Sequence, residues 1–143
     1  MKIKSVRCVR INAPVVQPGP NTRPGWNTHT IRSRPISRFT EYTRGNGNNP
    51  GSLPKAWVQI TAEDGTFGLG TCALGQVAAP LIDFSIAPAI EGRDPFAIEL
   101  INDLMWRAHE PFQGGIAAAA QSAVDLALWD LKGKLLERPV YEL

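Results

Sequence analysis

The chain has 143 residues, a length that suits one domain around a single hydrophobic core. Hydrophobic residues make up 43% and charged residues 20%, as in ordinary soluble globular proteins, and the net charge of +2 gives no reason to expect a nucleic-acid or membrane partner. No run of about 18 apolar residues occurs. The charged first residues precede no apolar signal-peptide core, so a cytoplasmic location is expected. A disulfide between Cys8 and Cys72 is geometrically possible, but two reduced thiols are favoured in that location.

The first half of the chain predicts a small antiparallel sheet. Residues 2–12 are rich in Val and Ile and predict a strand, and residues 55–62 alternate in polarity as a half-buried strand does. One face of that second strand is apolar, with Ala56, Val58, Ile60 and Ala62. Asp64-Gly65 is typical of a hairpin turn, and residues 66–74 form the return strand. Gly68 and Gly70 in that strand indicate a bulge or a close approach of another main chain.

The second half predicts about three helices. The first is a short apolar helix over residues 76–87. A second begins at Asp94-Pro95, with Asp as N-cap and Pro in the first turn, and its apolar residues are Phe96, Leu100, Leu104 and Ala108, beside Ile101 and Met105. The third covers residues 116–137, with an apolar stripe of Ile116, Ala120, Ala123, Val124, Ala127, Leu128, Leu131 and Leu135. The fold class is therefore α+β, a three-stranded antiparallel meander followed by these helices.

A long segment, residues 13–53, separates the first two predicted strands. It contains six prolines and five glycines and has no sustained hydrophobic period, which indicates a functional loop or a disordered stretch. Five of its residues are arginines and only one, Glu41, is acidic, so the loop carries +4 and the rest of the chain −2. The positive charge of the chain is thus concentrated in this loop.

The end of the chain carries its most specific pattern. It reads Ala120-Gln-Ser-Ala-Val-Asp125-Leu-Ala-Leu-Trp129-Asp130-Leu-Lys-Gly133-Lys134 and later Pro139-Val-Tyr-Glu-Leu143. Asp125 and Asp130 are about 140° apart around a helix, so they do not share a face and are expected to be polar anchors of a packing helix. The segment resembles the N-terminal signature of the mandelate racemase/muconate lactonizing enzyme family, in the order of small residues, Asp, Ala, Leu, acid, Gly, Lys, Pro and Leu.

This resemblance implies an enolase-like N-terminal capping domain over residues 1–138, with loop 13–53 as its specificity loop and residues 139–143 as the start of a (β/α) barrel. In the family, the catalytic base and the carboxylates that bind Mg²⁺ belong to the barrel. The chain itself is therefore expected to contain neither catalytic nor metal-binding residues and to be inactive alone. Its expected partners are its own C-terminal barrel, an anionic sugar-acid substrate and further copies in a homo-oligomer, with no nucleic acid and no membrane.

The loop also resembles one group within the family, the L-rhamnonate dehydratases. Pro35-Ile36-Ser37-Arg38-Phe39 and Glu41-Tyr42 match a run that precedes a substrate-contacting arginine there. The resemblance implies that Arg44 binds substrate, with His29 and Trp26 as further candidates. A solvated arginine, a surface histidine and a tryptophan that anchors the loop to its own domain are the structural alternatives.

Three functions remain open on these residues. The favoured one is the capping and specificity domain of a Mg²⁺-dependent acid-sugar dehydratase, which removes a proton next to a carboxylate. A racemase or cycloisomerase of the same superfamily is the second. The third is a non-enzymatic module whose arginine-rich loop, interleaved with Trp26, Phe39 and Tyr42, binds nucleic acid or another anion. The near-neutral charge of the whole chain disfavours the third function.

Overall fold

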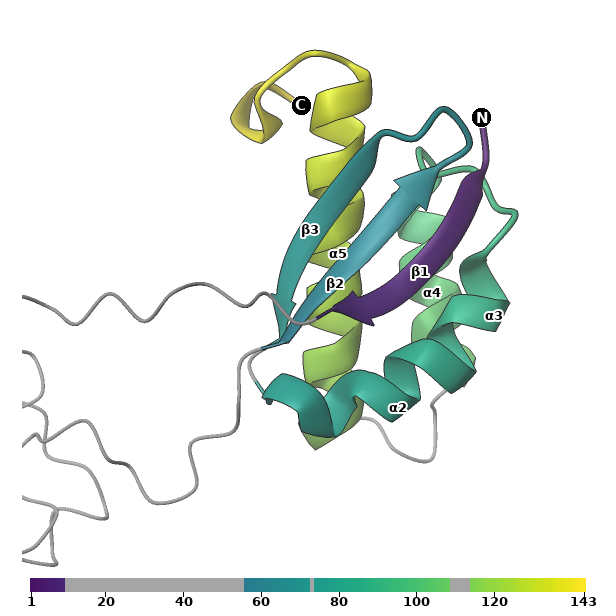
Figure 1. Cartoon of the computed structure of the whole chain (residues 1–143), viewed down its shortest axis with the longest axis vertical. Helices are drawn as coiled ribbons and strands as arrows, with labels where there is room; N and C mark the ends of the chain where they lie inside the picture. Colours follow the sequence, from purple (N-terminus) through teal and green to yellow (C-terminus); the bar gives the residue numbers. More distant parts are fainter. Residues whose placement is uncertain (10–55, 73, 109–113) are drawn as a thin grey trace, which may run out of the picture. The chain divides into compact units, whose positions relative to one another are not determined.

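The computed structural model describes residues 1–9, 56–72, 74–108 and 114–143 (Figure 1). Its sheet contains β1 (Ile3–Val9), β2 (Ala56–Ala62) and β3 (Phe67–Cys72), all antiparallel and in the order β1-β2-β3. The predicted meander is thereby confirmed, while the predicted extension of the first strand to residue 12 and loop 13–53 lie outside the described residues.

The turn between β2 and β3 forms where Asp64-Gly65 predicts it. The N–H of Ala62 donates to the Thr66 carbonyl oxygen at 2.8 Å, which closes the hairpin. Gly65 has a φ of +90°, which a residue with a Cβ rarely adopts. The Asp64 carboxylate accepts a hydrogen bond of 2.9 Å from the Thr66 N–H, which stabilises the turn.

One continuous helical segment follows the sheet, and it is less regular than the helix predicted for residues 76–87. It begins as a 3₁₀ turn, η3 (Gly75–Ala78), continues as α2 (Ala79–Leu81), widens into a π turn, η4 (Ile82–Ile86), and ends as α3 (Ala87–Ile90). The N–H of Ala87 bonds to the Ile82 carbonyl oxygen, the spacing of a π turn. Pro88 comes next and offers no N–H to an α-helical ladder, which accounts for the irregularity at this point.

Helix α4 (Ile98–Ala108) begins later than the sequence predicts. The Asp94 carboxylate accepts a 3.0 Å bond from the Phe96 N–H, and the Asp94 carbonyl oxygen accepts one of 3.1 Å from the Ala97 N–H. These bonds complete a separate turn, and the helix starts after it. The prediction that Asp94 is the N-cap is therefore wrong by one turn.

Helix α5 (Gly115–Leu135) confirms the third predicted helix but ends two residues early. Glu137 has a φ of +51°, so the chain turns into the left-handed region there, and the Arg138 N–H bonds to the Gly133 carbonyl oxygen at 2.9 Å. This bond pattern is a helix C-terminal cap. The helix is thus ended by its own cap before the chain reaches Pro139.

Helices α4 and α5 lie on one face of the sheet, with α5 along β2 and β3, while the segment of α2 and α3 runs past the outer side of β1 (Figure 1). The predicted apolar face of β2 is confirmed, because Ala56, Val58, Ile60 and Ala62 are all buried. The helical stripes are partly different from the predictions. In α4 the buried residues are Ile98, Ile101 and Met105, while Leu100 is exposed and Phe96, which precedes the helix, is exposed too. In α5 the first buried residue is Ala117, whereas the preceding Ile116, which the predicted stripe includes, is exposed.

Candidate functional site

One end of the sheet is where the long inserted segment leaves and rejoins the described chain. Val9, the last residue of β1, pairs with Trp57, and Ala56, the first residue of β2, pairs with Cys72 at the end of β3. We call the end defined by Val9, Ala56 and Cys72 the loop-bearing end. The Sγ of Cys72 lies 3.9 Å from the carbonyl oxygen of Ala119, so the beginning of α5 also approaches this end.

All three predicted substrate-binding residues belong to the segment between Val9 and Ala56. Arg44, His29 and Trp26 lie outside the described residues, and their roles stay predictions. The structure bears on them only through the position of Val9 and Ala56, which places both ends of the segment at the loop-bearing end. The two cysteines are described, and no disulfide joins them, with Cys8 half-buried and Cys72 buried.

A shallow hollow of about 250 Å³ lies near the loop-bearing end, between β1 and the helical segment. It is lined by Cys8, Gln76, Ala79, Pro80, Asp83 and Phe84. The single carboxylate among them, Asp83, already accepts a 2.8 Å bond from the Cys8 N–H. None of these six described residues carries a positive charge, so they supply no group that would bind the carboxylate of an acid sugar.

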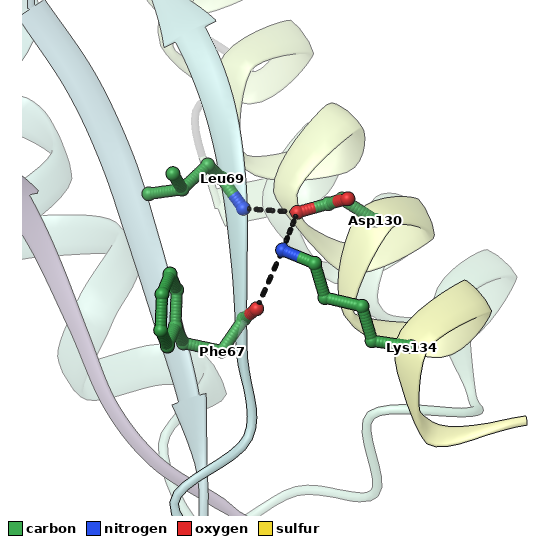
Figure 2. A network of polar contacts seen from close by, with 4 residues as sticks. All are labelled: Phe67, Leu69, Asp130 and Lys134. Carbon is green, nitrogen blue, oxygen red and sulfur yellow. Dashed lines mark hydrogen bonds and ion pairs between the residues drawn. The ribbon is translucent and has the colours of Figure 1, made fainter. Parts of the chain in front are cut away.

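A polar network joins α5 to the outer edge of β3 (Figure 2). One oxygen of Asp130 accepts bonds from the Leu69 N–H at 2.8 Å and from the Lys134 ammonium at 2.6 Å. Lys134 also donates to the carbonyl oxygen of Phe67 at 3.0 Å (Figure 2). We call Asp130 and Lys134 the edge clamp. The clamp uses Asp130 as a polar anchor, which is the role that the sequence predicts for it.

Asp125 anchors the same helix to a different neighbour. Its carboxylate accepts a 2.6 Å bond from the side-chain amide of Asn102 on α4, and Gln121 donates to the Asn102 carbonyl oxygen at 3.2 Å. Asp125 and Asp130 therefore contact different elements, as their spacing around the helix predicts. Both carboxylates are engaged in holding the fold together, and neither is paired with the other.

A second hollow, of about 370 Å³, lies where α5 ends, and sequence reasoning did not find it. It is lined by Asp130, Gly133, Lys134, Glu137, Arg138, Pro139 and Val140. Both of its cations have partners, because Lys134 bonds to Asp130 and Arg138 contacts Glu142 at 3.2 Å. Gly133 is the sequence signal for this close packing, since a Cβ there would come within 2.9 Å of the Arg138 carbonyl oxygen.

The described part of the chain contains no group of three or more His, Cys, Asp or Glu side chains that could hold a metal ion. The resemblance assigns the Mg²⁺ ligands to the barrel domain and not to these residues. No helix within the described ranges is long and apolar enough to cross a membrane.

The sheet, the helices packed against it and the pattern from Ala120 to Leu143 define an N-terminal capping domain. Residues 51–143 match the family model of the mandelate racemase/muconate lactonizing enzyme N-terminal domain, and the chain belongs to this family. An L-rhamnonate dehydratase from Saccharopolyspora erythraea is 32% identical over 100% of this chain. A D-mannonate dehydratase from Caulobacter vibrioides is 38% identical over 60% of it.

Solved structures show the same relationship. The L-rhamnonate dehydratase from Gibberella zeae superimposes with a TM-score of 0.76 over 99% of this chain, at 30% identity. A structure of that enzyme complexed with Mg gives a TM-score of 0.75. The chain covers 37% of the Saccharopolyspora enzyme, 22% of the Caulobacter enzyme and 33% of the Gibberella enzyme. It therefore spans about a third or less of the length of these relatives.

Proposed function

We propose that this chain is the capping and specificity domain of a Mg²⁺-dependent acid-sugar dehydratase that acts on rhamnonate-like aldonates. One observation carries the proposal. The two L-rhamnonate dehydratases align with 100% and 99% of the chain, so their match includes the long segment between β1 and β2, whereas the D-mannonate dehydratase aligns with 60%. A capping domain differs among related enzymes mainly in its loops, because loops carry the contacts with substrate.

The proposed reaction removes the proton next to the substrate's carboxylate and then eliminates the neighbouring hydroxyl as water. The resulting enol tautomerises to a 2-keto-3-deoxy acid. We assign the base and the ligands of Mg²⁺ to a barrel domain of the same polypeptide, as the resemblance to the family implies. Bound Mg²⁺ would supply a positive charge next to the substrate's carboxylate. The part of this chain is to cover the barrel opening, exclude water and contact the far end of the substrate.

Loop 13–53 is the proposed substrate-contacting part, with Arg44, His29 and Trp26 as its contacts. Its support is chemical and topological. The loop has an excess of four positive charges, and a guanidinium group binds a carboxylate or neighbouring hydroxyls through two parallel hydrogen bonds. Val9 and Ala56 lie at the same end of the sheet as Cys72, so the loop and the connection after β3 start from one place. Cytoplasmic location and assembly into a homo-oligomer belong to the same proposal.

The proposal is tested with the polypeptide that joins this chain to its barrel. Turnover is measured in the presence of Mg²⁺ against a library of aldonates. We expect dehydration of rhamnonate-like acids, and a protein that dehydrates none of them contradicts the proposal. A racemised or cyclised product, without loss of water, would instead identify the second function of the superfamily.

The loop is tested separately with Arg44→Ala. We expect a rise in KM of about tenfold or more, because a charged partner of the substrate is lost. Arg7→Ala is the matched control, since Arg7 is an exposed arginine of β1 outside the loop. If Arg44→Ala turns over substrate as the unaltered protein does, Arg44 does not contact substrate, even where the dehydratase activity itself is confirmed.

A further inference from the structure

A three-stranded sheet has two outer edges, and each presents main-chain N–H and carbonyl groups that could pair with another strand. In this sheet the edge strands are β1 and β3, with β2 between them. Such edges are sites where copies of a protein add to one another. Whether a second copy can pair with this sheet therefore depends on whether the outward main-chain groups of β1 and β3 already have hydrogen-bond partners within the chain.

The first part of the β1 edge is occupied by main chain. The Ile3 N–H donates to the Arg93 carbonyl oxygen at 2.8 Å, and the Gly92 N–H donates to the Ile3 carbonyl oxygen at 2.8 Å. The turn after α3 thus pairs with Ile3 as a short strand would. This half of the edge has no free pairing groups at Ile3.

Carboxylates occupy the second part of the β1 edge. The Val6 N–H donates to Glu91 at 3.0 Å, and the Cys8 N–H donates to Asp83 at 2.8 Å. Val6 and Cys8 are two residues apart, so both N–H groups point away from β2 in the same direction. Each is bonded to an acidic side chain, Asp83 from η4 and Glu91 from the turn that follows α3.

The β3 edge is occupied by the edge clamp. Asp130 accepts from the Leu69 N–H, and Lys134 donates to the Phe67 carbonyl oxygen (Figure 2). One acceptor and one donor are the two groups that a neighbouring strand would offer here. In the described part of the chain, the outer side of β3 is closed by side chains alone, and these are 37% exposed for Asp130 and 43% exposed for Lys134.

Close packing keeps the clamp in reach of β3. A Cβ at Gly68 would collide with the Ala127 carbonyl oxygen, and one at Gly70 with the Ala123 carbonyl oxygen. The glycines therefore let β3 lie directly against the backbone of α5. Asp130 and Lys134 follow Ala123 and Ala127 on the same side of the helix, because the spacing is three to four residues.

We propose that Asp83, Glu91 and the edge clamp prevent both edges of the sheet from pairing with a strand of a second copy of this chain. Of these groups, the edge clamp is the one whose loss opens the sheet to such pairing. The β1 edge keeps its main-chain bonds at Ile3 when one carboxylate is lost. The β3 edge has no such main-chain bonds among the described residues. Removal of Asp130 leaves the Leu69 N–H without its acceptor and Lys134 without its carboxylate.

The test uses the whole 143-residue chain with Asp130→Ala, compared with Asp125→Ala. Asp125→Ala is matched because it removes an aspartate from the same helix without touching β3. Self-association is followed by light scattering across a concentration series. We expect Asp130→Ala to associate at about a tenfold lower concentration than the unaltered chain, since one charge-assisted bond of the edge is lost. Asp125→Ala should associate as the unaltered chain does.

Two further variants show whether association uses the β3 edge. Thr71 has the same orientation in β3 as Leu69, so its N–H also points away from β2. Thr71→Pro removes that donor, and we expect it to return Asp130→Ala to the behaviour of the unaltered chain. Lys134→Met leaves Asp130 in place and should cause a smaller increase in association, which gives a test if Asp130→Ala does not fold.

The proposal is wrong if folded Asp130→Ala and Lys134→Met associate no more than Asp125→Ala. It is also wrong if Thr71→Pro leaves the association of Asp130→Ala unchanged, because the added contact would then lie elsewhere. Amide exchange in the unaltered chain is a further check. The Leu69 N–H should exchange at least about tenfold more slowly than an unprotected amide, and exchange at the unprotected rate would contradict the closure.

Discussion

Helix α5 makes two contacts of opposite character. Toward β3 it presents backbone, because glycines on the strand face alanines on the helix and leave no room for a Cβ. Toward α4 it presents side chains, and the two helices are joined by the polar contact between Asn102 and Asp125 beside the buried Ile101 and Met105. The first contact fixes the distance between two main chains, whereas the second can adjust by changing rotamers.

These two kinds of contact are expected to tolerate substitutions to different degrees. Side-chain interfaces accept substitutions of similar volume at small cost, since neighbours can repack. A main chain cannot move aside in the same way, because its own hydrogen bonds hold it. The β3–α5 contact is therefore expected to be the part of the domain that is most sensitive to added volume, and the exposed side of α4 the least sensitive.

The largest effect is expected from Gly70→Ala. The new Cβ would collide with the Ala123 carbonyl oxygen, so β3 and α5 must separate. We expect a loss of about 3 kcal/mol or more in the free energy of unfolding, measured by urea denaturation. Met105→Leu at the α4 side is the control, with an expected loss below about 1.5 kcal/mol. Equal losses for the two variants would remove the distinction between the contacts.

Asp130→Ala is expected to come next. It leaves the Leu69 N–H without its acceptor, and such a loss costs about 2 kcal/mol. The exposed ion pair with Lys134 adds little to this figure because water screens it. Urea denaturation measures the change, and Asp130→Asn, which keeps an oxygen acceptor, should lose less. A fully stable Asp130→Ala would show that the clamp does not hold β3 to α5.

The sequence predicts the β3–α5 contact better than the α4 contact, for a physical reason. Gly68 and Gly70 inside a strand predict either a bulge or a close approach of another main chain, and the structure has the close approach, while Asp64-Gly65 predicts the hairpin turn. Helix α4 offers no such restricted residues. Its apolar side chains include Leu100 and Trp106, both of which are exposed, so the apolar pattern alone does not identify the buried face.

The candidate site also has a part that the sequence predicts and a part that it does not. The pattern from Ala120 to Leu143 predicts the family, because it combines small, acidic and glycine residues at fixed spacing, and the match over residues 51–143 confirms it. The partners of Asp130 could not be predicted, since they are main-chain groups of β3 and have no signature in the sequence. Arg44, His29 and Trp26 rest on a resemblance within the loop, and they remain predictions.

On the α4 side, Asn102→Ala tests the polar part of the adjustable contact. The change removes the donor to Asp125 but leaves that carboxylate half-buried and able to take water as a partner. We expect a loss of about 1 kcal/mol in the free energy of unfolding, the usual net value of one hydrogen bond. A loss as large as that of Gly70→Ala would mean that α4 is held as rigidly as β3. Thermal unfolding of the two variants side by side gives the ranking.

The smallest effect is expected on the outer side of α4, where Asp103 and Arg107 form an exposed ion pair of 2.8 Å. The hydrogen bond from Arg107 lowers the pKa of Asp103 below its ordinary value. A carboxylate whose pKa is lowered in the folded state contributes stability above its ordinary pKa and loses that contribution as the pH falls through the lowered value. Asp103→Asn should therefore reduce stability slightly at neutral pH and not at all in strong acid. Because both side chains are more than half exposed, water screens the ion pair. The expected change in the free energy of unfolding is therefore close to the smallest change that urea denaturation can detect. A clear loss at neutral pH that disappears in high salt would show that charge on this surface matters more to α4 than its side-chain packing does.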